Sequence, residues 1–244
     1  MSARVLIWGG TGGVGSAAAR ALSAAGWRVH LAARDEARLA EVAREVDATG
    51  TSVADVGDPA AIARATEEAS AGEGLAGLVY AVGSINLKPF GKLTQEDFLA
   101  DFRLNALGAA QAVQAALKPF RQANGASVVL FSTIAANQGF SAHASVAMAK
   151  GAVQGLTLAL AAELAPKVRV NCVAPSLLDT DLARPITSNA TMAQAIAGMH
   201  AIPRLGTGED VGALAAFLLS PQASWITGQT IGVDGGRSTL RVKG

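Results

Sequence analysis

A glycine-rich loop between an apolar run and a small-residue stretch constrains the fold of this chain most. Residues 4–8 (RVLIW) are apolar, residues 9–15 (GGTGGVG) contain five glycines, and residues 16–25 carry mainly alanine. Glycine lets the backbone turn sharply and approach a pyrophosphate, and the free N–H groups at a helix start attract its charge. The alternative is an ordinary turn between strand and helix. The order strand, glycine loop, helix favours a dinucleotide-binding fold.

The rest of the chain continues this alternation. Further strands are predicted at residues 27–32, 51–56, 75–83, 126–134 and 168–174, and further helices at 35–46, 58–70, 95–120 and 143–163. Alternating strands and helices predict a Rossmann-type, doubly wound parallel sheet with helices on both faces. The 244 residues contain no linker or repeat, so we expect one α/β domain over residues 1–244.

Composition excludes several classes of protein. Hydrophobic residues make up 50% of the chain and charged residues 16%, which argues against disorder. The net charge of +1, without a basic run, gives no indication of nucleic acid or an anionic membrane surface. The single cysteine, Cys172, excludes an internal disulfide and fits a reducing cytoplasm. We also expect no signal peptide and no membrane span. The three histidines lack the spacing of metal ligands, so we expect no metal site.

The predicted helix over residues 143–163 carries only two charges, Lys150 and Glu163. Burying an ammonium group costs several kcal/mol unless partners compensate. Lys150 either extends to the surface or is held inside for a reason.

From end to end the chain resembles the short-chain dehydrogenase/reductase family. Members of that family carry Tyr-x-x-x-Lys on this helix, and the lysine holds the nicotinamide ribose and lowers the pKa of the tyrosine. Lys150 matches the lysine, but Val146 stands where the tyrosine is expected. A valine cannot transfer a proton, so the resemblance implies hydride chemistry while leaving the proton donor open.

The resemblance also implies a nicotinamide dinucleotide site spread along the chain. Its residues are Gly9, Thr11, Gly13, Val14, Gly15, Arg34, Asp55, Val56, Ala81, Gly83, Lys150, Pro175, Leu178 and Thr180. Ala33 fills the position of the acid that binds the ribose 2′-hydroxyl of NAD, and Arg34 follows, so NADP(H) is favoured over NAD(H). Arg34 could instead be a solvated loop residue, and Asp55 could serve the turn at 55–59 as well as the adenine.

Several positions depart from the family pattern. Trp8 replaces a threonine before the first glycine, and Ser176 replaces a glycine after Pro175. The family's Asn-Asn-Ala-Gly stands here as residues 80–83 (YAVG). Tyr80 is the only tyrosine, and on a buried strand it is better explained as structural than as a catalytic acid.

Four residues are candidate catalytic groups. Asn105, unusual inside a helix, matches the asparagine that holds a relay water in the family. Thr133, with Ser132 as the alternative, matches the hydroxyl that bonds the substrate oxygen. His143 lies seven residues before Lys150, where enoyl-thioester reductases of this superfamily carry a tyrosine, so it would share a helix face with Lys150. A different helix start would leave His143 in a loop, lining the pocket.

Three functions remain open from the sequence. The first is an NADP-dependent oxidoreductase acting on a small, fairly apolar carbonyl or alcohol, the second a reductase of an activated C=C bond, and the third a non-catalytic NADP-binding sensor or scaffold. Residues 182–200 should form a substrate lid with few charges. The resemblance further implies a C-terminal helix at 209–219, a last strand within 225–236, and a homotetramer packed through helices 95–120 and 146–165 and that strand.

Overall fold

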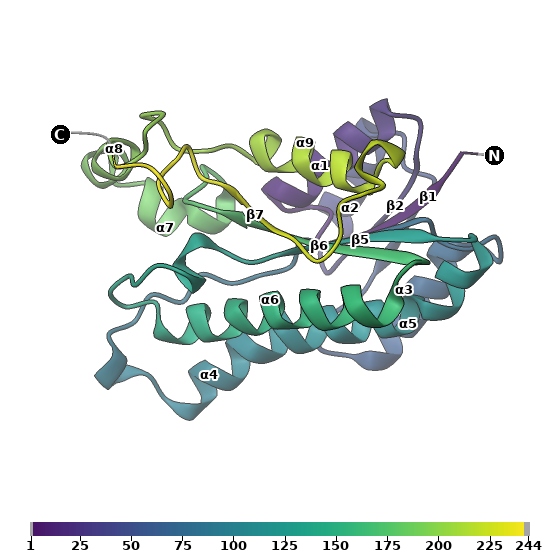
Figure 1. The fold of residues 1–244 in the computed structure, drawn as a ribbon, viewed down its shortest axis with the longest axis horizontal. Coiled ribbons are helices and arrows are strands. Elements are labelled where there is room, and N and C mark those ends of the chain that lie inside the picture. Colours follow the sequence, from purple (N-terminus) through teal and green to yellow (C-terminus); the bar gives the residue numbers. More distant parts are fainter. Residues whose placement is uncertain (1, 242–244) are drawn as a thin grey trace.

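A parallel sheet with helices on both faces forms the centre of the computed structural model, which describes residues 2–241. The seven strands lie in the order β3-β2-β1-β4-β5-β6-β7, and every pair is parallel. Figure 1 shows α1, α2 and α9 on one face and α3, α4, α5 and α6 on the other. The predicted Rossmann-type, doubly wound fold is therefore confirmed. Residues 1 and 242–244 of the predicted domain lie outside the described residues.

The strands are β1 (Arg4–Trp8), β2 (Arg28–Ala33), β3 (Gly50–Val53), β4 (Gly77–Tyr80), β5 (Ala126–Phe131), β6 (Val168–Pro175) and β7 (Thr230–Val233). The α-helices are α1 (Gly13–Ala24), α2 (Glu36–Glu45), α3 (Pro59–Ser70), α4 (Gln95–Phe102), α5 (Gly108–Gln122), α6 (Ala144–Leu164), α7 (Arg184–Thr187), α8 (Ala190–Ala197) and α9 (Gly208–Leu219).

The central strands are apolar throughout because helices bury both of their faces. In β1, Leu6 and Trp8 enter the core shared with α3 and α5, while Val5 and Ile7 enter the core shared with α1 and α9. Trp8, which replaces the family's threonine, is fully buried in the first of these cores. The strand order reverses between β1 and β4, and in such sheets ligands bind at the carboxyl ends beside this switch point.

The predicted helix over residues 95–120 has an unexpected interruption. A five-residue π-helical turn, Arg103–Leu107, connects α4 to α5, and Asn105 is at its middle. The π turn alters the hydrogen-bonding pattern, and the hydroxyl of Tyr80 donates to the Leu104 carbonyl at 2.7 Å. Tyr80 is 2% exposed, and burial raises its pKa above the ordinary value, which supports the structural role predicted for it.

Four predicted strands are shorter than expected. β3 ends at Val53, β4 at Tyr80 and β5 at Phe131, and β7 covers only Thr230–Val233. Where β3 ends, Asp55 accepts a hydrogen bond from the Gly57 amide at 2.7 Å, so the turn considered for residues 55–59 is present. After β4 and β5, residues 81–83 and 132–134 line the cavity described below, whereas Ala54 and Val56 after β3 pack in the core.

Helix α6 is the longest helix and begins at Ala144, one residue later than predicted. By length and composition alone, α6 is the one helix of residues 2–241 that could cross a membrane. From the sequence we expect no membrane span because no uncharged apolar run is long enough. Helix α6 is long enough, but it contains the charged residues Lys150 and Glu163. Its Val153 and Ala161 pack in the core under the sheet, which accounts for the apolar composition.

Candidate active site

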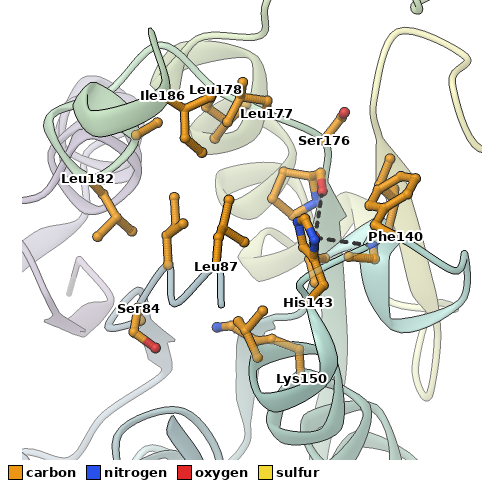
Figure 2. A pocket seen from close by; sticks show the side chains of 18 of the residues that line it. Ser84, Leu87, Phe140, His143, Lys150, Ser176, Leu177, Leu178, Leu182 and Ile186 are labelled. Carbon is orange, nitrogen blue, oxygen red and sulfur yellow. Dashed lines mark hydrogen bonds between the residues drawn. The ribbon is translucent and has the colours of Figure 1, made fainter. Parts of the chain in front are cut away.

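A cavity of about 520 Å³ opens at the carboxyl ends of the central strands. The glycine loop contributes Val14, the end of β4 contributes Ala81 and Gly83, and Thr133 follows β5. The cavity therefore lies at the switch point of the sheet. Figure 2 shows Lys150 and His143 on one side of it and the apolar side chains of residues 177–186 facing them.

The glycine loop is packed too closely for any side chain at two positions. Gly9 has φ of +74°, and a Cβ there would lie 2.8 Å from the Ala81 backbone. A Cβ on Gly15 would collide with the Gly9 carbonyl oxygen. The backbone of residues 9–15 thus turns tightly into the start of α1, whose N-cap is Gly12 and has no side chain to bond the first amides. These residues fit a pyrophosphate group.

Of the other predicted cofactor residues, those near the nicotinamide end come together. Ala81, Gly83, Lys150, Pro175, Leu178 and Thr180 all line the cavity with Val14. Thr180 also touches the loop, since a Cβ on Gly13 would lie 2.6 Å from its methyl group. One chain segment from β6 is therefore held directly against the glycine loop.

Arg34 and Asp55 lie at the other end of the predicted dinucleotide site, outside the cavity. Arg34 directly follows β2, and its side chain is 78% exposed. Its guanidinium is 3.9 Å from the Asp55 carboxylate, a weak pair between two exposed groups. Val56 follows Asp55 and is buried in the core. Arg34 is therefore accessible to a ligand beside the end of β2.

Lys150 is buried, so the surface alternative considered for it is wrong. The residue is 7% exposed, and its Nζ donates a 2.8 Å hydrogen bond to the Phe131 carbonyl at the end of β5. Burial lowers the pKa of Lys150 to about 8, against the weaker opposing effects of Cys172 and Asp101. The lysine of the predicted motif is thus positioned in the cavity wall with few protein partners.

Asn105 reaches the same place from the π turn. Its Nδ2 donates to Ser84 Oγ at 3.0 Å and to the Asp101 carbonyl at 2.8 Å, whereas its buried Oδ1 has no partner among the described residues. A Cβ on Gly83 would lie 3.2 Å from both Asn105 Oδ1 and Lys150 Nζ. Gly83 therefore leaves space between the two groups. An unsatisfied buried acceptor facing such space suits a bound water.

The two hydroxyl candidates after β5 differ in how they are bonded. Ser132 is 3% exposed and donates to the Lys150 carbonyl at 3.0 Å while accepting from Gln154 at 3.1 Å. Among residues 2–241, Thr133 makes only two long bonds, accepting from the Ala135 amide at 3.2 Å and donating to the Pro175 carbonyl at 3.4 Å. The Ser132 hydroxyl is already used in hydrogen bonds that connect the end of β5 to α6. The Thr133 hydroxyl is therefore freer to bind a substrate.

The position predicted for His143 on the helix is wrong. His143 is the N-cap residue of α6, with φ of −106° and ψ of 8°, so it does not share a helical face with Lys150. Its Nδ1 lies 2.7 Å from the Ser141 carbonyl, and its ring packs edge-on against Phe140 at 5.4 Å. The alternative prediction describes it better, because His143 lines the cavity from the loop before the helix.

Sequence reasoning missed the carboxylate behind these residues. Asp101 is 3% exposed and accepts hydrogen bonds from Ser84 and Ser145 at 2.6 Å each and from Asn86 at 3.2 Å. Because Ser84 also accepts from Asn105, the carboxylate orients Asn105 through one hydroxyl. An aspartate four residues before Asn105, one helical turn away, was the sequence feature that could have indicated it.

The segment predicted to be a lid forms one wall of the cavity. It contains a 3₁₀ turn at Asp181–Ala183 and the short helices α7 and α8. Leu182, Ile186, Met192 and Ile196 line the cavity from this segment. Arg184, its predicted charged exception, instead pairs with Asp181 at 2.6 Å on the surface.

Comparison with known proteins assigns the family. Residues 9–238 match the family described as Enoyl-(Acyl carrier protein) reductase, which is nearly the whole chain. A tropinone reductase homologue of Arabidopsis thaliana is 36% identical over 96% of this chain and 89% of its own length. The protein belongs to the short-chain dehydrogenase/reductase family. It is therefore related throughout its length to NAD(P)-dependent oxidoreductases.

Other members of the short-chain dehydrogenase/reductase family are similar in sequence and structure. L-xylulose reductase of Bos taurus is 32% identical over 96% of this chain and 95% of its own. A short-chain type dehydrogenase/reductase from Mycobacterium ulcerans superposes with a TM-score of 0.92 at 33% identity, covering 99% of this chain and 92% of that one. A gluconate 5-dehydrogenase from Burkholderia cenocepacia, solved with NADP and tartrate, gives 0.92 at 26% identity over 99% and 97%.

Proposed function

We propose that this family member is an NADP(H)-dependent oxidoreductase of a small, fairly apolar carbonyl or alcohol, working with Val146 in the place of the family's tyrosine. One observation carries the proposal: Lys150, Thr133 and His143 line a single cavity that begins at the glycine loop. A cofactor-binding protein without chemistry could use Lys150 for the ribose, but it has no need for a relay-water site at the unsatisfied Asn105 Oδ1.

Each residue has a separate task in this proposal. The bound nicotinamide supplies or accepts the hydride. Lys150 holds the ribose through its ammonium group, and Thr133 donates its hydroxyl hydrogen to the substrate oxygen. Asn105 Oδ1 accepts a hydrogen bond from a water that connects Lys150 to solvent. Val146, 6% exposed, gives the cavity wall an apolar surface.

His143 is the proposed proton donor in the reducing direction. If Nδ1–H donates to the Ser141 carbonyl, Nε2 is the nitrogen that can transfer a proton toward the substrate. In the imidazolium form that proton passes to the developing alkoxide, and it returns from solvent at the exposed loop. An imidazole is a competent general acid near neutral pH.

The proposed preference for NADP(H) rests on the end of β2. Ala33 carries no carboxylate to bind a ribose 2′-hydroxyl, and the exposed Arg34 beside it can pair with a 2′-phosphate. The Burkholderia cenocepacia relative was solved with NADP. A protein that used NADH equally well would contradict this assignment.

A second candidate function is reduction of an activated C=C bond. The apolar Val146 in the cavity wall favours it, because the enolate formed after hydride transfer to the β-carbon can take its proton from solvent. The absence of the tyrosine therefore slows C=C reduction less than it slows carbonyl reduction. The family match carries an enoyl reductase description as well.

We further propose a cytoplasmic homotetramer. Apolar side chains are exposed along the α4–α5 and α6 faces, including Phe102 at 40% and Leu158 at 61%. Trp225, 99% exposed just before β7, supports contact through the last strand. The buried Cys172 thiol, whose pKa burial raises to about 11, suits a reducing compartment.

The test of the function is NADPH consumption, followed by absorbance, against a panel of ketones, aldehydes and enones, with NADH in parallel. Turnover of ketones or aldehydes supports the first candidate, and turnover of enones alone supports the second. Tight NADPH binding without any turnover would overturn both and favour a cofactor sensor or scaffold.

A further inference from the structure

The cavity wall contains a second cation besides Lys150. Arg237, from the segment after β7, lines the same cavity, and among the described residues no aspartate or glutamate lines it. Most of the remaining wall is aliphatic or aromatic, with Leu87, Leu182 and Ile186 on the side facing Lys150 in Figure 2. The cavity is thus positively charged without an internal counterion.

The guanidinium of Arg237 is held by neutral groups only. Its Cζ lies 4.8 Å from the centre of the Phe140 ring, Nη1 is 3.4 Å from Ser176 Oγ, and Nη2 is 3.4 Å from Met199 Sδ. Within residues 2–241 no carboxylate approaches it to ion-pair distance. Asp234 is the acid whose charge opposes the lowering of the Arg237 pKa, and its carboxylate accepts from the Gly236 and Ser238 amides at 2.8 and 3.0 Å.

These contacts orient the guanidinium without neutralising it. A ring face attracts a cation and fixes its plane, but the long bond to Ser176 and the weak one to the Met199 sulfur leave most of the five N–H donors for another partner. Partial burial lowers the pKa of Arg237 from its ordinary value, which reflects the cost of holding the charge there. An anion that enters the cavity would recover this cost.

We propose that Arg237 binds a carboxylate of the substrate, so that the substrate is an apolar carbonyl or enone compound carrying an acid group. Guanidinium and carboxylate form two parallel charge-assisted hydrogen bonds, a geometry that neutral amides and esters cannot match. The carbonyl or alkene lies at the Lys150 and Thr133 end, the carboxylate at Arg237, and the aliphatic lid residues cover the body between them. The substrate class rests on the proposed function, whereas the anion site does not.

A purely structural role for Arg237 gives a different expectation. The cation over Phe140 also attaches the segment after β7 to the loop before α6, and Phe140 packs on His143. In that case replacing Arg237 would lower stability and affect every ligand alike. Only a binding site would change the preference between a charged ligand and a neutral one of the same shape.

The first experiment measures binding of hexanoate and of hexanamide by calorimetry to the full chain saturated with NADP⁺. We expect hexanoate to bind at least about tenfold more tightly, a typical gain for a charge-assisted pair. Arg237→Gln should remove this preference while leaving hexanamide affinity within about twofold. Arg64→Gln on the exposed α3 surface removes the same charge and should keep the preference. Equal affinities in the wild type, or an unchanged preference in Arg237→Gln, would overturn the proposal.

A second experiment separates this site from the proposed function and from folding defects. Turnover of 6-oxoheptanoic acid is compared with that of its methyl ester, and thermal melting follows the fold of each variant. We expect Arg237→Gln to raise KM for the acid about tenfold or more and to leave KM for the ester unchanged.

Selective hexanoate binding without turnover of either ketone would reject the oxidoreductase function and retain the anion site. Equal turnover of acid and ester, unaffected by Arg237→Gln, would reject the site and retain the function. If Arg237→Gln melts early, Arg237→Lys must show a reduced preference for hexanoate, or the proposal fails.

Discussion

Lys150 is a buried ammonium group with a single protein acceptor, the Phe131 carbonyl. Its folded-state pKa of about 8 lies below the ordinary 10.5, so between these values the unfolded chain binds more protons than the folded one. The free energy of unfolding contributed by this residue therefore rises with pH across that window, by up to about 3 kcal/mol.

Replacing Lys150 with methionine should remove this contribution. We expect the stability difference between wild type and Lys150→Met to change in favour of the wild type from about pH 8 to about pH 10, with little change from pH 6 to 7.5. Urea unfolding of both proteins without cofactor, at matched ionic strength, measures the difference. Parallel pH dependences would show that Lys150 titrates as a solvated lysine does.

His143 gives a prediction about catalysis. His143→Phe keeps an aromatic ring packed edge-on against Phe140 but has no transferable proton, so turnover should fall about a hundredfold or more while NADPH affinity changes less than about twofold. Steady-state kinetics and NADPH fluorescence titration measure the two quantities. Unchanged turnover would exclude His143 as the proton donor and leave water or the substrate as the proton source.

A rise in the rate of ketone reduction on Val146→Tyr would show that the cavity keeps the geometry of a tyrosine-dependent reductase.

The sequence predicted those residues whose identity is imposed by the backbone. No residue with a Cβ fits at Gly9 or Gly15, and the apolar residues 4–8, which end at Trp8, form a buried strand as predicted. His143 was misplaced because spacing in the sequence does not show where a helix begins. Arg237 and Asp101 were missed because their contacts are with distant segments: Phe140 packs against the Arg237 guanidinium, and Ser84 donates to the Asp101 carboxylate.

The segments α4, α6 and the loop after β4 meet at Asp101, which explains how the π turn is held. The carboxylate bonds Ser145 of α6 and both Ser84 and Asn86 of that loop. A π turn is intrinsically less favourable than continuous α-helix, so it persists where tertiary contacts stabilise it. Here those contacts are the Asp101 network and the Tyr80 hydroxyl on the Leu104 carbonyl.

Asp101→Ala should therefore destabilise the protein and displace Asn105. The buried Ser145 hydroxyl and the half-buried Ser84 and Asn86 donors lose their acceptor, which we expect to lower the free energy of unfolding by about 3 kcal/mol. Asp101→Asn, of the same shape, should cost less. Urea unfolding with Glu41→Ala as control, an exposed α2 carboxylate, measures the effect. Loss of less than about 0.5 kcal/mol in Asp101→Ala would show that solvent replaces the network.

The proposed homotetramer would account for apolar surface that one chain leaves uncovered. In Figure 1, α4, α5 and α6 lie together on one face of the sheet, away from α1 and α9. Leu99, Phe102 and Leu107 are 37–41% exposed on the α4–α5 side, and Met148 and Leu158 are 51% and 61% exposed on α6. A two-fold axis that paired this face with a second copy would bury all five side chains at once.

The proposed assembly contains four chains if Trp225 and β7 make a second, independent two-fold contact. Light scattering after gel filtration should give about four times the 24.6 kDa chain mass for the wild type. Leu158→Arg places a charge in the α6 interface and should halve that mass, since the contact through β7 is left intact. Phe90→Ser removes an equally apolar side chain, 75% exposed on the 3₁₀ turn Phe90–Lys92, and should change nothing. A wild-type chain that remains monomeric at about 50 μM, a concentration at which a stable interface would be saturated, would assign the exposed face to another partner.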